Sequence, residues 1–231
     1  MIVLGIETAT NNTGVALASG DRVLSSFQLS HRRLHAETLV PAIAFVCEQA
    51  RVQLSDIDVL AVDQGPGLFT GLRVGVATAK ALAYALGKPM IGFCSLDVLA
   101  FGAALFEGTI ICVLDALKGE VFLASFVSDG HAVRRISAPR VTSPTEAAAS
   151  LSGRSGRFLL LGDGATRYSE IFCQALPTAE IGDRLLELPS PVSLVCLAGK
   201  AIAAGGLASE SEIQPMYLRE PYIYPQPTER T

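Results

Sequence analysis

Three β-strand patterns precede the first helix pattern in this chain, and that order restricts the fold more than any other feature of the sequence. Ile2–Glu7 is apolar and β-rich, a turn follows at Thr8–Asn12, and Gly14–Ser19 resumes the apolar pattern. A third strand, Arg22–Leu29, comes after the Gly20-Asp21 turn. Strand and helix normally alternate from the start of an α/β chain, so three consecutive antiparallel strands indicate a different topology.

Helices and strands alternate only after this opening. The segment His35–Arg51 has apolar residues at the spacing of an amphipathic helix, and Gly87 is placed to end a second, alanine-rich helix. The predicted elements are the helix His35–Arg51, the strand Asp56–Asp63, the helix Val74–Leu86, the strand Met90–Phe93 and the helix Leu96–Ala104. The resulting order is β-β-β-α-β-α-β-α.

A second unit repeats the three-strand opening on a smaller scale. Ser143-Pro144-Thr145-Glu146 is a capping box that begins a short helix. A later helix, Val192–Ala204, could pack against either half. The predicted strands are Ile110–Asp115, Glu120–Ser128, His131–Arg135 and Phe158–Gly162. We therefore predict an α/β protein of two similar lobes, residues 1–105 and 106–231, the second ending in an extended tail with Pro221, Pro225 and Pro227.

Composition and charge narrow the class of protein. Half of the 231 residues are hydrophobic and 17% are charged, which is enough apolar material for a large core. The formal net charge of −4 argues against strong nucleic-acid binding by this chain alone, because phosphate backbones are bound by clustered Lys and Arg. The five cysteines lie far apart without a CxxC pair, which favours buried reduced thiols over disulfides or zinc.

The apolar segments do not have the form of targeting or membrane segments. The first residues carry no cationic start, and Glu7 interrupts their apolar run, which predicts a cytoplasmic protein. The stretches Val76–Leu86 and Val192–Ala204 contain Lys80 and Lys200, and both are shorter than the roughly 20 residues that cross a bilayer. We predict no membrane span.

A glycine-rich loop joins a predicted strand to a predicted helix, where backbone amides can hold an anion. Its glycines do not match the Walker or GxGxxG spacings. A tight turn that permits close contact between helix and strand explains the same glycines. The loop residues that could bind a nucleotide or another anion are Gly65, Gly67, Thr70, Gly71 and Arg73.

The turn after the first strand is the second candidate. An actin-type fold holds the phosphates and metal of ATP at this turn, against an acid and hydroxyl groups. Here Glu7 would be the acid and Thr8 and Thr10 the hydroxyls. An ordinary polar hairpin is the alternative.

No catalytic or metal-binding set of residues is predicted. His31 and His35 have i, i+4 spacing, but no third ligand is in register and Arg32 and Arg33 would repel a cation. The sequence has no GxSxG elbow for a Ser/His/Asp triad.

Four segments resemble the TsaB (YeaZ) family and occur in the order of that family. They are Leu4-Gly5-Ile6-Glu7-Thr8-Ala9-Thr10, the GPGxFTGxRxG segment from Gly65 to Gly75, Asp115-Ala116 with Gly119-Glu120-Val121-Phe122, and Pro215-Met216-Tyr217-Leu218-Arg219. The resemblance implies two ribonuclease-H-like lobes of the actin/hexokinase type. It also implies a non-catalytic subunit of the complex that forms threonylcarbamoyladenosine on tRNA.

The resemblance further implies partners. These are a TsaD-type catalytic subunit and a TsaE-type ATPase, with tRNA contacted only indirectly and no cofactor bound by the chain alone, although ATP or ADP could lie at the interface with the partner. TsaD-type proteins carry a metal-binding HxxxH whose positions here match Ser95 and Leu99, so the catalytic ligands are missing.

The family docks through two helices of its first lobe, which match His35–Arg51 and Phe69–Leu86. The same surface could form a homodimer when the partner is absent. Candidate interface residues are Leu39, Ile43, Val46, Leu72 and Val76, for which burial in the core is the alternative.

Two other functions remain open from the sequence. One is an ATP-binding kinase or ATPase of the same fold, suggested by Glu7–Thr10 and by the loop Gly162–Ala165. The other is a glycoprotease or metal hydrolase that would depend on His31 and His35.

Overall fold

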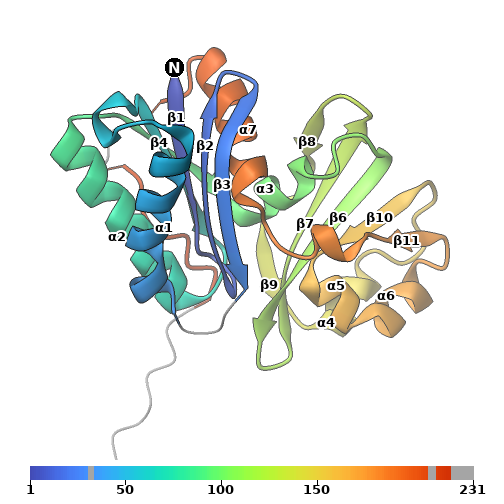
Figure 1. Cartoon of the computed structure of the whole chain (residues 1–231). Coiled ribbons are helices and arrows are strands. Elements are labelled where there is room, and N and C mark those ends of the chain that lie inside the picture. Colours follow the sequence, from blue (N-terminus) through green and yellow to red (C-terminus); the bar gives the residue numbers. More distant parts are fainter. Residues whose placement is uncertain (31–33, 208–211, 220–231) are drawn as a thin grey trace, which may run out of the picture.

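Two β-sheets stand side by side in a computed structural model of the protein, each covered by helices (Figure 1). The structure describes residues 1–30, 34–207 and 212–219. His31 and the proline-containing tail lie outside these residues. The fold class predicted from the sequence, α/β with two mixed sheets and their helices, is confirmed.

The first sheet has five strands in the order β3-β2-β1-β4-β5. The first three strands of the chain are antiparallel neighbours, whereas β4 and β5 run parallel to β1. The antiparallel pairing of the first three strands is as predicted from the sequence. The strands are β1 (Ile2–Glu7), β2 (Asn12–Ser19), β3 (Arg22–Ser30), β4 (Val59–Gly65) and β5 (Met90–Cys94).

Helices cover both faces of the first sheet because side chains alternate between its faces. Leu4 and Ile6 share a core with the helices α1 (His35–Ala50) and α2 (Phe69–Leu86) on one face. Val3 shares a core with α7 (Pro191–Ala203) on the other face. A short 3₁₀ helix, Leu54–Asp56, precedes β4.

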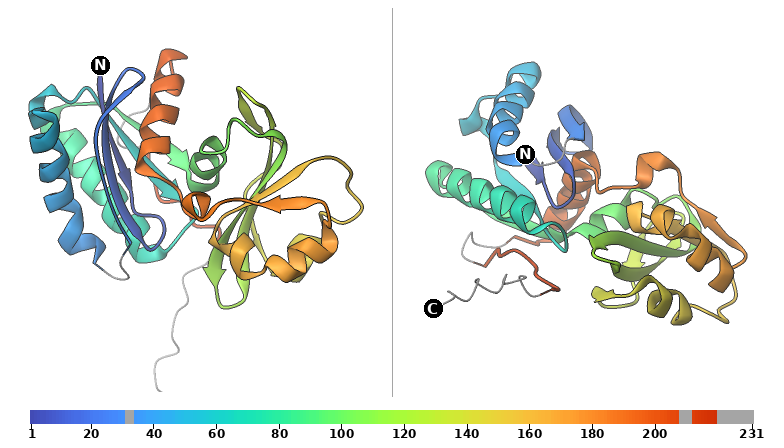
Figure 2. Two further views of the ribbon diagram at one scale, coloured as in Figure 1. Left: turned by 45° about the vertical axis from the view of Figure 1, so that its right-hand side comes forward. Right: turned by 90° about the horizontal axis from the view of Figure 1, so that it is seen from below.

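The second sheet has the order β11-β10-β6-β7-β8, with β9 also paired to β7. The helices α4, α5 and α6 pack against one face of this sheet. The other face packs against α3 (Ser95–Phe101), which lies between the two sheets (Figure 2). The remaining elements are β6 (Glu107–Leu117), β7 (Glu120–Asp129), β8 (Val133–Arg135), β9 (Arg140–Thr142), α4 (Pro144–Ala149), β10 (Phe158–Leu161), α5 (Asp163–Arg167), α6 (Ser169–Ala175), β11 (Ala179–Ile181) and the 3₁₀ helix Arg184–Leu186.

The differences from the predicted elements have local causes. Helix α2 begins at Phe69 rather than at Val74, because the residues after the glycine loop are already helical. The capping box of α4 forms as predicted, with Ser143 and Glu146 bonding to each other's backbone amides. The short elements β9, α5, α6 and β11 were not predicted.

Helix α7 packs on the first sheet although it follows the second sheet in the chain. Leu194, Val195 and Ala198 are buried against β1, β2 and β4. The segment 106–231, predicted as the second lobe, therefore contributes a helix to the core of the first, because the face of β1 opposite α1 needs an apolar cover.

Among the described residues, no helix combines the length and apolar character needed to cross a bilayer. All five cysteines are free thiols; Cys47, Cys94 and Cys112 are buried, as predicted, whereas Cys173 and Cys196 are partly exposed.

Candidate functional site

The two loops named as candidates for anion binding lie in direct contact. The Thr8 hydroxyl donates a hydrogen bond of 2.8 Å to the carbonyl of Gly71, and the Leu68 amide donates one of 2.7 Å to the carbonyl of Ala9. The turn after β1 and the loop before α2 therefore form one unit at the carboxyl edge of the first sheet.

The glycines of this loop permit the contact. A Cβ atom on Gly67 would overlap the carbonyl oxygen of Ala9, and one on Gly71 would overlap the carbonyl oxygen of Thr8. A Cβ atom on Gly75 would overlap the hydroxyl of Thr8. The glycine pattern thus serves close packing between helix and strand, which the sequence offered as the alternative to anion binding.

The polar groups of the two loops are largely occupied within the protein. The Ala9 amide donates to Glu7 Oε1 at 2.8 Å, and the Gly65 amide donates to Asp63 Oδ1 at 2.8 Å. The Thr10 hydroxyl accepts a bond of 3.4 Å from the Asn12 amide. Glu7 has no exposed surface. These groups act as internal braces.

Arg73 points away from the loop pair. Its guanidinium lies 3.7 Å from the centre of the Phe69 ring, and its Nε donates a bond of 3.1 Å to the Tyr217 hydroxyl. The rings of Phe69 and Tyr217 are 5.1 Å apart. Thr70, beside them at the start of α2, is exposed. Arg73 therefore holds a segment from the end of the described chain.

That segment, residues 213–219, is here called the C-terminal strap, and it connects the two lobes. Ile213 lies in the core of the first lobe, whereas Met216 and Leu218 pack against the core of the second. Arg219 donates to the carbonyl of Ala116 at 3.1 Å and pairs with Glu120 at 3.4 Å. Periodicity and spacing gave no sign that this segment belongs to the site. It was noted only because residues 215–219 resemble a family motif.

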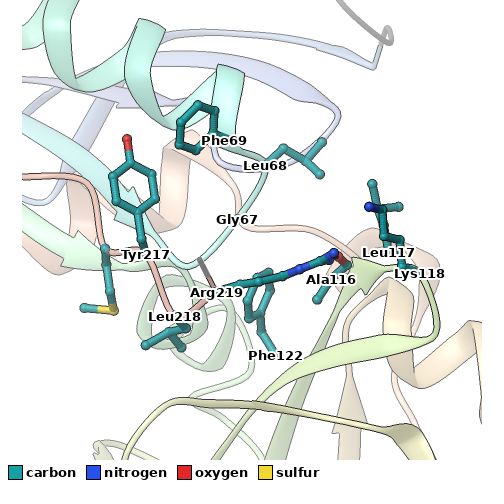
Figure 3. Close-up of a pocket in the computed structure, with 11 residues that line it drawn as sticks. Gly67, Leu68, Phe69, Ala116, Leu117, Lys118, Phe122, Tyr217, Leu218 and Arg219 are labelled. Atoms are coloured by element: carbon teal, nitrogen blue, oxygen red, sulfur yellow. Dashed lines mark hydrogen bonds between the residues drawn. The ribbon is translucent and has the colours of Figure 1, made fainter. Parts of the chain in front are cut away.

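The strap encloses a cavity of about 280 Å³ between the lobes (Figure 3). Phe69 and Tyr217 lie on one side of it, and Phe122 and Arg219 lie on the side of the second sheet. The lining is mostly apolar.

A second, smaller cavity of about 200 Å³ adjoins the turn after β1. Its polar side chains come from both lobes and include Thr10, Asp115, Asp163 and Arg167. Arg167 pairs with Asp115 at 2.7 Å, and the Asp115 amide donates to Asp163 Oδ1 at 2.9 Å. Burial raises the pKa of the Asp163 carboxyl to about 6.

The five interface candidates lie in the core. Their side chains are no more than 4% exposed, and all but Leu72 belong to the core that α1 and α2 form with the first sheet. Large hydrophobic side chains of the same helices that do reach the surface include Val40, Phe45 and Tyr84, which are 62%, 45% and 82% exposed. The buried residues named as candidates are Leu39, Ile43, Val46, Leu72 and Val76.

No group of three or more His, Cys, Asp or Glu residues that could hold a metal ion occurs in the part of the chain that the structure describes. His35 is buried, and its Nδ1 lies 2.9 Å from the Thr13 hydroxyl. At the two positions matched to the HxxxH ligands, Ser95 bonds Asp63 at 2.6 Å and Leu99 is buried against the second sheet.

The two sheets, the β-β-β-α opening and the loop pair at the junction of the lobes define a two-lobed α/β protein of the actin/hexokinase type. A family model described as tRNA N6-adenosine threonylcarbamoyltransferase matches residues 22–226, and the chain belongs to that family. Within it, the similarities described next place the chain with the TsaB (YeaZ) proteins.

The relatives cover nearly the whole chain. The chain is 29% identical over 222 residues to the tRNA threonylcarbamoyladenosine biosynthesis protein TsaB of Escherichia coli, covering 95% of each. It is 35% identical over 225 residues to an uncharacterized protein of Mycobacterium tuberculosis, covering 96% of this chain and 94% of that one. The solved structure of YeaZ from Pseudomonas aeruginosa superposes with a TM-score of 0.79 at 28% identity, covering 94% of this chain and 99% of that one.

The close loop contact predicts that Gly71→Ala destabilises the protein. The new methyl group would overlap the Thr8 carbonyl, and such overpacking costs about 1–3 kcal/mol of unfolding free energy. Gly199→Ala is the control, because the nearest atom to its added Cβ is 3.7 Å away and alanine favours a helix by up to about 1 kcal/mol. Urea denaturation measures both. Equal stability of the two variants would contradict the packing role.

From the contacts of the strap we expect Arg219→Ala to lower the free energy of unfolding slightly. This change removes the bond to Ala116 and the pair with Glu120, at a cost of about 1 kcal/mol. Limited proteolysis should then cleave near the strap faster than in the unmodified protein. Arg157→Ala, which removes the exposed pair with Glu180, should leave the cleavage rate unchanged. Equal cleavage rates in all three proteins would refute the role of Arg219 in fastening the strap to the second lobe.

Proposed function

We propose that the protein is a non-catalytic partner subunit in the formation of threonylcarbamoyladenosine on tRNA. It binds and stabilises a TsaD-type catalytic subunit in the cytoplasm, works with a TsaE-type ATPase, and meets tRNA only through them. The name of the Escherichia coli relative and the matched family model support a part in threonylcarbamoyladenosine formation.

The observation that carries the proposal is the state of the two positions matched to metal ligands. A metal that polarises a threonylcarbamoyl donor needs ligands such as imidazole or carboxylate facing open space. Ser95 is fully buried and hydrogen bonded to Asp63, and Leu99 is 2% exposed. Neither side chain can replace a histidine as a metal ligand. This supports a role as a binding partner of the catalytic subunit.

Helices α1 and α2 supply the docking surface in this proposal. They lie side by side on the outer face of the first lobe (Figure 1). Val40, Phe45 and Tyr84 are large hydrophobic side chains exposed on these helices, and aromatic side chains are enriched in protein interfaces. The same surface pairs two copies of the chain when the catalytic subunit is absent. In this proposal ATP or ADP is held between the subunits.

A second candidate function is nucleotide binding by the chain itself, as in a kinase or ATPase. The polar cavity with Asp115, Asp163 and Arg167 between the lobes favours it. The direct packing of Thr8 and Ala9 on the glycine loop disfavours it, since protein atoms occupy the space between those loops. Calorimetry with Mg-ATP decides: saturable binding by the isolated protein would support this function over the first.

The docking surface predicts that Tyr84→Glu weakens the complex with the TsaD-type subunit at least tenfold, because a charge would be buried at the interface. Leu185→Glu is the matched control on the second lobe, where Leu185 is 87% exposed. Co-purification followed by titration calorimetry measures both.

Equal affinity of the two variants would show that the helices do not dock the partner. Transfer of threonylcarbamoyl to tRNA by the isolated protein would refute the non-catalytic role itself.

A further inference from the structure

Glu7 and Asp63 form a buried pair of carboxyl groups at the ends of β1 and β4. Neither side chain has exposed surface, and the strands that carry them are parallel neighbours in which Ile6 pairs with Val62, one residue before each acid. One oxygen of each accepts bonds from elsewhere: Glu7 Oε1 from Ala9, and Asp63 Oδ1 from Gly65 and Ser95. In the part of the chain described, Glu7 Oε2 and Asp63 Oδ2 are buried and have no hydrogen-bond partner.

We propose that this pair shares one proton, carried by Glu7 and donated to Asp63, and that the shared proton locks the two loops of the first lobe together. A carboxylate buried without a cation or a donor is strongly disfavoured, and two of them side by side are more so. Two carboxyl groups can bond to each other only if one is protonated, because an ionised carboxylate has no hydrogen to donate.

The donors around the pair decide which group holds the proton. Asp63 receives hydrogen bonds from the Gly65 amide and the Ser95 hydroxyl, at 2.8 and 2.6 Å, and these stabilise its charged form. Glu7 receives one, from Ala9. Asp63 is therefore the carboxylate and Glu7 the acid.

The other titratable groups near the pair do not replace the proton. Asp97, on α3, adds negative charge and is itself paired with Arg135 at 3.4 Å. Cys94, at the end of β5, has its pKa raised to about 12 by burial, so it stays a neutral thiol. His35, on α1, has its pKa lowered by burial and bonds Thr13 rather than the pair. Arg73, on α2, is turned outward to Phe69 and Tyr217.

The lock joins three strand ends through one proton. Glu7 holds the turn after β1, Asp63 holds the loop before α2, and Ser95 is the first residue of α3 after β5. This inference concerns the folded chain alone and does not depend on the proposed partner.

The shared proton fixes the sign of a pH effect. Burial, with the nearby Asp63 charge, raises the pKa of Glu7 well above its ordinary value of 4.5. Between 4.5 and the raised pKa, the folded state holds a proton that the unfolded state releases, so stability falls as pH rises. One proton lowers the ratio of folded to unfolded protein about tenfold per pH unit in that window.

The test compares Glu7→Gln with Asp63→Asn in urea denaturation between about pH 5 and pH 9. The amide introduced by Glu7→Gln keeps a donor toward Asp63 and cannot ionise, so this variant should stay folded. With each rise of one pH unit, its ratio of folded to unfolded protein should increase about tenfold relative to that of the unmodified protein. Asp63→Asn keeps the oxygen that accepts from Gly65 and Ser95 but removes the carboxylate that accepts the proton of Glu7, so it should be less stable than Glu7→Gln at every pH. Glu48→Gln, an exposed change on α1, should follow the unmodified protein.

A second measurement does not depend on the Asp63 variant folding. Infrared spectroscopy at pH 7 should show a protonated carboxylic acid band that Glu7→Gln removes and Glu48→Gln retains. Parallel pH profiles for Glu7→Gln and the unmodified protein, or no such band, would overturn the proposal. Stabilisation of the unmodified protein by Mg²⁺ or Ca²⁺ that both variants lose would also overturn it, because the pair would then hold a cation.

Discussion

The fold of the first lobe depends on a backbone contact between the turn after β1 and the start of α2. Three glycines of α2 and its loop lie where any Cβ atom would overlap Thr8 or Ala9. Because the contact is this close, a side chain at any of the three positions would push α2 away from the sheet. That position fixes the exposed face of α2 and the place of Phe69 and Arg73, which hold the strap.

The same contact occupies the turn at which this type of fold can bind phosphate. The turn after the first strand carries an acid and two hydroxyl residues, the composition of a phosphate site. In this chain the acid is sealed beneath the loop and the Thr8 hydroxyl is bonded to Gly71. Hydrogen-bond donors and acceptors that are satisfied internally gain little from a ligand, since binding would have to break those bonds first. The architecture is retained, and the loops act as internal bracing.

Sequence periodicity predicted most of the first lobe because its strands and helices are long and one-sided. The β-β-β-α opening and the end of α2 at Gly87 all formed as predicted. Helix α7 could not be assigned to a lobe from its pattern, because an apolar face does not identify the sheet that it covers. The elements α5 and β11 have five and three residues, too few for a period to be recognised.

The site was less predictable for a related reason. Periodicity identified Leu39, Ile43 and Val46 as the apolar face of α1, but a core face and an interface share the same composition. The structure buries these three side chains in the core, whereas Val40 on the same helix and Tyr84 on α2 are exposed. The Glu7 and Asp63 pair was invisible for a different reason: the residues are far apart in the sequence, at the ends of strands whose parallel pairing places them together. Parallel neighbours such as β1 and β4 bring their carboxyl ends to one edge of the sheet. Acidic residues near both of these ends therefore lie next to each other. Hydrogen-bond donors from the adjacent loops and from Ser95 stabilise the two acids, so this edge of the sheet holds the loops in place.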